Sequence, residues 1–200
     1  VTIPEKIIFN SGIGINLKFY QKMENLHYFL KFCKDLGVSE ISLFESSDLA
    51  NFLTEDDCYS VVDYCKMASY SYGEVDYPGA IPTGMIHEID ETTEIYKLFQ
   101  SKTENLVTEY PLYRMYVNCF APGENPYFHI DGTHGVTFLF YANEEWNIEM
   151  HGETQFLVDN EIYGVLPYPN RMVKFNSDIM HRATSFRDRH RFTLAVKYSL

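Results

Sequence analysis

The side chains with the clearest chemical potential are a histidine and an aspartate separated by one residue, His129 and Asp131. Alternate side chains of an extended segment point the same way, so these two can hold one ion together. An imidazole combined with a carboxylate suits Fe(II), Mn(II) or Zn(II). The pair alone is a weak signal, because His151 and Glu153 have the same spacing.

Residues further along the chain strengthen the metal interpretation. His181 begins a strand-like segment 50 residues after Asp131, and Arg191 follows ten residues later at the start of an apolar strand. With these residues the chain resembles the 2-oxoglutarate- and Fe(II)-dependent oxygenases, specifically the prolyl-4-hydroxylase-like branch. The resemblance covers residues 113–198 and rests on elements in the family's order and spacing: Ala121-Pro122-Gly123, His129 with Asp131, Tyr141-Ala142-Asn143, the segment 151–156, the segment 167–175, and His181 with Arg191.

The resemblance implies a metal centre of a defined type. His129, Asp131 and His181 are expected to form a 2-His-1-carboxylate facial triad for Fe(II). Three ligands on one face of an octahedron leave three positions free, two for the 2-oxoacid end of 2-oxoglutarate and one for O₂. Zinc in structural roles prefers a closed tetrahedron, so an open triad favours redox-active iron.

The resemblance also implies residues that bind 2-oxoglutarate. Arg191 is expected to meet the distal carboxylate in two charge-assisted hydrogen bonds, and Thr154 to donate its hydroxyl to the same group. The family has a tyrosine nine residues before the first histidine, where this chain has Phe120. Tyr116 and Asn118 lie on the same strand face as Phe120, so either can substitute, and we favour Tyr116.

Three other polar residues have more conservative interpretations. His151 is expected at a strand entry or at the rim of the site. His190 should face away from the side that carries Arg191, because neighbouring residues of a strand point to opposite faces. Asn143 either reaches the co-substrate or caps a turn.

The elements that must position these residues change character near residue 110. Before it, apolar residues at helical spacing predict helices over 21–36, 54–67 and 90–106. The second helix is predicted to begin with a capping box, in which the threonine at 54 is followed by acidic residues up to Asp57. After it, short β-branched and aromatic runs between turn signals predict strands over 112–120, 135–141, 153–158, 171–175 and 192–198. Residues 70–84 are predicted to form a long loop, either a plain connector or a lid that faces the substrate.

Helices followed by strands indicate an α+β fold. The strand spacing indicates a sandwich or jelly roll in the C-terminal half, with N-terminal helices packed on one sheet. The family resemblance implies that this core is a double-stranded β-helix, which is a jelly roll. We therefore predict one oxygenase domain over 1–200, in which 1–110 is mainly helical support and 111–200 is the catalytic core.

Composition limits what the protein binds and where it works. The chain has 200 residues with ordinary hydrophobic (46%) and charged (22%) content, and its formal net charge of −12 opposes binding to duplex nucleic acid. No run approaches the roughly 18 apolar residues of a membrane span, and no secretory signal is visible. We therefore expect a cytoplasmic protein that does not enter membranes, with a monomer as the default state.

The expected function follows from the resemblance. It is hydroxylation of a C–H bond coupled to decarboxylation of 2-oxoglutarate, which releases succinate and CO₂, with ascorbate considered as a reductant. The prolyl-hydroxylase-like motifs imply a prolyl residue in a peptide or protein as substrate. Two alternatives stay open: the same chemistry on a small metabolite, free amino acid or nucleobase, and a non-catalytic jelly-roll binding module.

Overall fold

The computed structural model describes residues 6–9, 14–16, 41–43 and 51–200, and the chain divides into two compact units, 1–50 and 51–200. The described residues of the first unit form an antiparallel sheet in the order β2 (Gly14–Asn16), β1 (Lys6–Phe9), β3 (Ile41–Leu43). The helix predicted over 21–36 lies outside the described residues. All the predicted site residues belong to the second unit.

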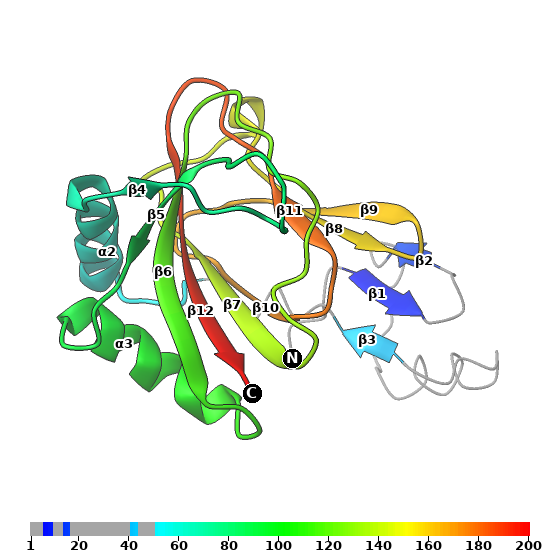
Figure 1. Ribbon diagram of the computed structural model, residues 1–200, viewed down its shortest axis with the longest axis horizontal. Helices are drawn as coiled ribbons and strands as arrows, with labels where there is room; N and C mark the ends of the chain where they lie inside the picture. Colours follow the sequence, from blue (N-terminus) through cyan, green and yellow to red (C-terminus); the bar gives the residue numbers. More distant parts are fainter. Residues whose placement is uncertain (1–5, 10–13, 17–40, 44–50) are drawn as a thin grey trace. The chain divides into compact units, whose positions relative to one another are not determined.

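A six-stranded antiparallel sheet forms the centre of the second unit (Figure 1). Its order is β10 (Met172–Asn176), β7 (Gly135–Tyr141), β12 (Arg191–Ser199), β6 (Leu112–Phe120), β5 (Met85–Glu88), β4 (Ser71–Tyr72). The strands predicted over 112–120 and 135–141 are confirmed with these bounds. The predictions over 171–175 and 192–198 differ from β10 and β12 by one residue at each end. The short strands β5 and β4, of which β4 is the edge of this sheet, were not predicted.

A smaller antiparallel sheet has the order β11 (His181–Ala183), β8 (Thr154–Val158), β9 (Glu161–Val165). Asp159 and Asn160 join β8 to β9 with positive φ angles of 51° and 63°, the sign that a two-residue type I′ hairpin requires. β9 was not predicted, because most of its side chains are exposed and its alternation is weak. The rings of Phe156 on β8 and Phe175 on β10 lie 5.0 Å apart and join the two sheets.

Two helices of the second unit, α2 (Glu55–Met67) and α3 (Glu94–Thr103), lie on one side of the large sheet (Figure 1). The ring centres of Phe99 on α3 and Phe140 on β7 lie 5.2 Å apart, so aromatic side chains fill the space between helix and sheet. The two antiparallel sheets and the helices on one face confirm the predicted α+β jelly roll. No helix in the described part of the chain is long and apolar enough to cross a membrane.

The helix ends follow local capping chemistry. The Thr54 hydroxyl accepts a hydrogen bond from the Asp57 backbone N–H (3.2 Å), so the predicted capping box begins α2. The predicted helix at 90–106 begins later, at Glu94, because Asp90 instead accepts the backbone N–H of Thr92 (2.8 Å) in a turn and Thr93 becomes the N-cap. It ends as α3 at residue 103, and a 3₁₀ turn covers Glu104–Leu106.

The central strand β12 separates two cores. Its alternate residues Leu194 and Val196 are fully buried, and Tyr198 exchanges a hydrogen bond with Thr103 of α3 (2.8 Å). The other face of β12 looks towards the small sheet and lines a cavity with Arg191, Thr193, Ala195 and Lys197. A single strand therefore supplies both the packing against the helices and one wall of the candidate site.

Candidate metal centre and carboxylate subsite

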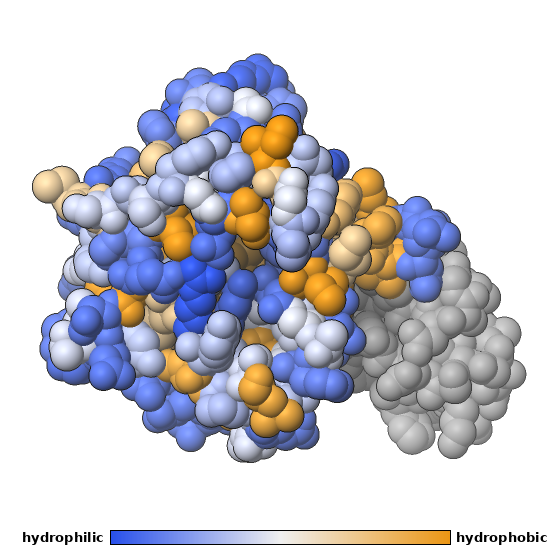
Figure 2. Space-filling view, in the orientation of Figure 1, coloured by the Kyte–Doolittle hydropathy of each residue, from blue (hydrophilic) through white to orange (hydrophobic). Residues whose placement is uncertain are grey.

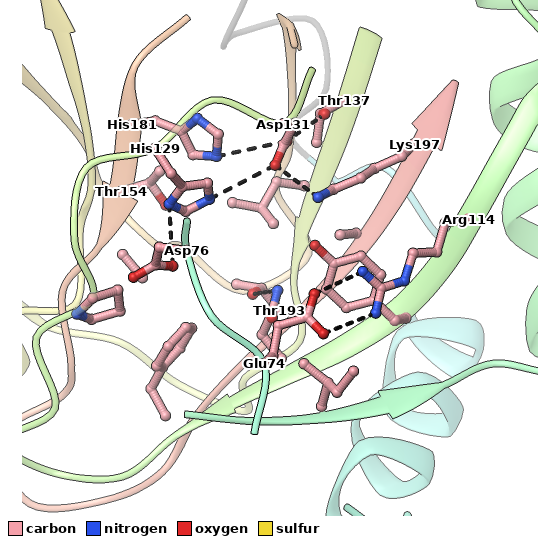
Figure 3. A pocket seen from close by; sticks show the side chains of 18 of the residues that line it. Glu74, Asp76, Arg114, His129, Asp131, Thr137, Thr154, His181, Thr193 and Lys197 are labelled. Atoms are coloured by element: carbon pink, nitrogen blue, oxygen red, sulfur yellow. Dashed lines mark hydrogen bonds and ion pairs between the residues drawn. The ribbon is translucent and has the colours of Figure 1, made fainter. Parts of the chain in front are cut away.

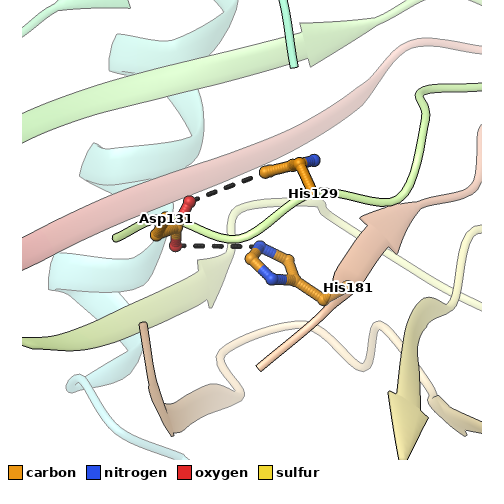
Figure 4. Close-up of side chains that lie close together, drawn as sticks. All are labelled: His129, Asp131 and His181. Carbon is orange, nitrogen blue, oxygen red and sulfur yellow. Dashed lines mark ion pairs between the residues drawn. The ribbon is translucent and has the colours of Figure 1, made fainter. Parts of the chain in front are cut away.

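Two histidines and one aspartate from distant parts of the chain come together between the sheets (Figure 4). His129 and His181 form a backbone bridge, in which each N–H donates to the other residue's carbonyl at 3.0 and 2.9 Å. Their ligating atoms and those of Asp131 all lie within 4.8 Å of one another. The convergence on which the metal prediction depended is therefore present in the structure.

The spacing of these atoms suits a coordinated ion better than direct hydrogen bonds. The Nε2 atoms of His129 and His181 each lie 3.7 Å from a different carboxylate oxygen of Asp131. That distance is too long for a hydrogen bond, and it matches ligands that share an ion at about 2.0–2.2 Å each. The donor set of two imidazoles and one carboxylate fits Fe(II).

Both imidazoles are oriented by their other nitrogen. His181 Nδ1 lies 2.9 Å from the Ile179 carbonyl, and His129 Nδ1 lies 3.1 Å from the Tyr127 carbonyl. A carbonyl accepts the Nδ1 proton and so leaves the lone pair on Nε2, which faces the cluster. The His181 ring is also packed against Phe175 at 4.6 Å.

Asp131 is almost fully buried and has a protein partner on each oxygen (Figure 3). The Thr137 hydroxyl donates to Oδ2 at 2.6 Å, and Lys197 Nζ lies 2.7 Å from Oδ1. Burial acts to raise the pKa of Asp131, but the Lys197 ammonium and the nearby hydroxyl hold it below its usual value. The sequence analysis missed Thr137 and Lys197, although Lys197 shares a strand face with Arg191 and was identifiable from that alternation.

Burial lowers the pKa of His181 to about 4, so in the metal-free protein this imidazole stays neutral. Between pH 6.5 and 4 the His181 imidazole is protonated in the unfolded chain but not in the folded chain. Lowering the pH over this range therefore reduces the free energy of unfolding by up to about 3 kcal/mol. We expect the free energy of unfolding of EDTA-treated protein, measured by urea unfolding, to fall over that pH range. His181→Gln should remove this contribution, and an identical pH slope in the variant would refute the assignment.

Arg191 forms a second charged feature beside the metal cluster and is fully buried. Its Nε donates to the Gly152 carbonyl (2.7 Å) and its Nη2 to the Thr154 hydroxyl (2.8 Å). Its Nη1 is buried and has no hydrogen-bond partner among the described residues. No carboxylate of those residues forms an ion pair with the guanidinium. A buried cation with an unused donor fits a carboxylate supplied by a ligand.

Tyr141 brings its hydroxyl to Thr154, which is a hydrogen-bond partner of Arg191. Tyr141 donates to the Thr154 hydroxyl at 2.8 Å, and its ring centre lies 5.5 Å from Arg191 Cζ. The strand register pairs Phe120 with Arg191, which places Tyr116 four residues, roughly 13 Å, further along β6. Register, and not strand face alone, therefore decides which side chains lie close to Arg191, and the preference for Tyr116 as substitute for the family tyrosine stays a prediction.

Tyr116 and Asn118 nevertheless line the same cavity as Arg191. The Tyr116 ring lies between two cations, 4.2 Å from Arg114 Cζ and 5.0 Å from Lys197 Nζ. Asn118 Nδ2 lies 3.5 Å from the Thr193 hydroxyl, at the limit of a hydrogen bond. A contact of either residue with the co-substrate stays a prediction.

The remaining polar candidates lie outside the cluster. His151 is exposed with Nε2 3.0 Å from Arg187, and His190 is exposed next to Arg191. Asn143 donates to the Phe192 carbonyl (3.1 Å) and accepts the Phe192 N–H (3.0 Å), so it ties a loop to β12. These placements favour the rim and turn interpretations over roles in the metal centre.

The metal cluster and Arg191 line one cavity of about 260 Å³. In the space-filling view, hydrophilic side chains gather around the hollow near the middle of the second unit, and hydrophobic residues surround it as separate patches (Figure 2). Glu74, Val75, Asp76 and Thr83, all within 70–84, also line the cavity. The predicted long loop therefore contributes a wall of the site and is more than a connector.

Comparison with known proteins supports the fold class. No family model matches the chain, and no curated protein is similar to it in sequence. A prolyl-4-hydroxylase from Pseudomonas putida matches in structure with a TM-score of 0.61 and 18% identity, covering 75% of this chain and 89% of that chain. A prolyl hydroxylase from Trichoplax adhaerens, in complex with a hypoxia inducible factor peptide fragment, matches with a TM-score of 0.63 and 18% identity, covering 89% and 94%.

A third solved structure extends the similarity beyond prolyl hydroxylases. HygX from Streptomyces hygroscopicus, with nickel and 2-oxoglutarate bound, matches with a TM-score of 0.58 and 11% identity, covering 75% of this chain and 80% of that chain. The chain thus has the jelly-roll fold of the 2-oxoglutarate- and Fe(II)-dependent oxygenases. Prolyl-4-hydroxylases are prominent among the similar structures, so the resemblance to that branch is confirmed at the level of the fold.

Proposed function

We propose that this protein is a 2-oxoglutarate-dependent oxygenase that hydroxylates a C–H bond and releases succinate and CO₂. The observation that carries the proposal is the buried Arg191 guanidinium, whose unused Nη1 donor shares a cavity with the His129–Asp131–His181 cluster. A metal cluster alone suits many functions. A buried cation without a counter-ion in the same cavity calls for an anionic ligand beside the metal.

Each residue has a defined part in this proposal. The cluster holds Fe(II), which supplies the redox chemistry with O₂ when bound. Arg191 binds the distal carboxylate of 2-oxoglutarate and so orients the 2-oxoacid end towards the cluster. Thr154 accepts hydrogen bonds from both Arg191 Nη2 and the Tyr141 hydroxyl, which leaves its own proton free to donate to the same carboxylate.

Replacement of Thr154 by valine tests this subsite without touching the metal. The change removes one hydrogen bond to a charged group and leaves Arg191 Nη2 without its acceptor, so we expect about 10–100-fold weaker 2-oxoglutarate binding. Thr154→Ser should restore most of the affinity, and Mn²⁺ affinity should be unchanged in both variants. Calorimetric titration with Mn²⁺ in place of iron measures these constants. Unaltered 2-oxoglutarate affinity in Thr154→Val would remove the residue from the subsite.

We further propose a prolyl residue in a peptide or protein as the substrate. A structurally similar prolyl hydroxylase has been solved with a peptide fragment, which supports this substrate class. Near the cavity, the exposed rings of Tyr77 and Tyr127 contact each other at 5.5 Å, and Tyr113 is a third exposed aromatic that lines it. Exposed aromatic surface of this kind suits packing against an extended chain.

Succinate release from 2-oxoglutarate tests the function and the substrate class together. The purified chain is supplied with Fe(II), 2-oxoglutarate and ascorbate, and then with peptides that differ by Pro or Ala at one position. We expect turnover that only the Pro peptides stimulate, with one oxygen atom added to the proline. Stimulation by free amino acids, nucleobases or small molecules would support the alternative substrates, and HygX, solved with hygromycin B bound, is a structural neighbour that takes a small molecule.

A purified chain that binds neither Mn²⁺ nor 2-oxoglutarate would instead support the non-catalytic binding module. The proposed catalytic machinery lies entirely within 51–200. The prediction of one oxygenase domain over 1–200 stays a prediction.

A further inference from the structure

A carboxylate outside the metal cluster contacts one of its histidines from the segment between β4 and β5, residues 73–84. Asp76 Oδ1 lies 3.3 Å from His129 Nδ1, and Asp76 Oδ2 accepts the Tyr127 backbone N–H at 2.7 Å (Figure 3). The Asp76 side chain is 14% exposed, although the flanking residues 73–75 and 77–79 are exposed. Within the exposed stretch 73–79, one largely buried side chain therefore lies behind a metal-cluster histidine.

The three members of the cluster differ in how the fold holds them. His181 and Asp131 have side chains that are 9% and 3% exposed, and their partners come from the large sheet and the turn before β11. His129 is 22% exposed and stands outside the named strands. Its Nδ1 is oriented by the adjacent Tyr127 carbonyl and by Asp76. Asp76 is therefore a side chain of segment 73–84 that lies directly against a histidine of the cluster.

Segment 73–84 has a second attachment away from the metal. Arg114 of β6 donates to both carboxylate oxygens of Glu74, from Nη1 to Oε1 at 2.8 Å and from Nη2 to Oε2 at 3.3 Å. The base of the segment is closed by the Tyr72 hydroxyl, which donates to the Pro82 carbonyl at 2.7 Å. Two acidic residues thus pin the segment over the cavity: Glu74 on the sheet and Asp76 on the metal cluster.

We propose that Asp76 is a positioning residue that couples metal binding at His129 to docking of segment 73–84 over the cavity. A carboxylate that accepts the Nδ1 proton of a ligating histidine fixes its ring and strengthens Nε2 as a donor to the metal. A bound cation in turn polarises the imidazole, whose Nδ1 proton is donated to the Tyr127 carbonyl, and so strengthens the electrostatic attraction between this side of the ring and the Asp76 carboxylate 3.3 Å away. Metal affinity and segment docking therefore favour each other by the same factor. The inference rests on the metal site of the proposed function.

Mn²⁺ affinity of the full chain tests the first half of the coupling. We expect Asp76→Ala to weaken Mn²⁺ binding about 10–100-fold, the range typical for loss of an outer partner of a metal ligand. Asp76→Asn keeps the shape and an acceptor for Tyr127 N–H but loses the charge, so it should also weaken binding if it folds as the parent does. Glu88→Gln is the matched control: it removes an exposed carboxylate that pairs with Arg114 from β5, outside segment 73–84 and outside the cavity lining, and should change Mn²⁺ affinity less than about twofold.

Hydrogen exchange of segment 73–79 tests the second half. Saturating Mn²⁺ should slow exchange there in the parent chain and in Glu88→Gln, but not in Asp76→Ala at its own saturating concentration. The inference is overturned if Asp76→Ala and Asp76→Asn bind Mn²⁺ like the parent, or if Mn²⁺ protects the segment equally in Asp76→Ala. A parent chain that binds Mn²⁺ and 2-oxoglutarate in either case leaves the proposed function standing. A parent chain that binds no metal overturns both.

Discussion

Replacement of Asp131 by asparagine is expected to abolish both metal binding and turnover of 2-oxoglutarate. The carboxylate is the anionic member of the cluster, and its charge offsets that of the cation it holds. Loss of a direct ligand should cost more than the 10–100-fold typical of outer partners. Mn²⁺ titration followed by electron paramagnetic resonance measures the affinity, and succinate release measures the turnover.

The buried pair of Asp131 with Lys197 complicates the simpler alanine variant. Asp131→Ala leaves the Lys197 ammonium buried without its partner, which we expect to destabilise the fold by about 3–5 kcal/mol. The double variant Asp131→Ala with Lys197→Met removes both charges, so it should regain most of the stability in urea unfolding but none of the metal affinity. Metal binding near the parent value in a folded Asp131 variant would exclude this residue as a ligand.

The second large effect is expected at Arg191. Arg191→Met should weaken 2-oxoglutarate binding by about 10²–10³-fold, because it removes one partner of a buried charge pair with the ligand. Mn²⁺ affinity should stay at the parent value, which separates this variant from the Asp131 series. Arg191→Lys should rescue little, because one ammonium cannot reach Gly152, Thr154 and the ligand carboxylate together.

Thermal unfolding provides an independent measurement for Arg191. In the parent chain loaded with Mn²⁺, 2-oxoglutarate should raise the melting temperature by mass action, since it binds the folded state alone. The shift should disappear in Arg191→Met. An equal shift in parent and variant would show that the ligand carboxylate binds elsewhere.

Local sequence patterns were sufficient to predict most of the secondary structure. Period-two alternation located β6 and β7, and a threonine followed by acidic residues located the start of α2. The same approach missed the short strands β1 to β5, as well as β9, whose mostly exposed side chains interrupt the pattern. It also began α3 too early, because Asp90 caps a turn. Sequence patterns do not predict an element when its residues show neither the regular alternation that burial causes nor the residue types that cap helices.

The sequence by itself indicated the histidines, the aspartate and the arginine, because residue type and spacing along the chain carry that information. It did not reveal Lys197 beside Asp131, Tyr141 behind Thr154 or Asp76 behind His129. These contacts depend on how β12 is registered between β6 and β7, and on where segment 73–84 crosses the cavity. Such pairings join residues far apart in the chain, so the tertiary packing that buries both partners decided them.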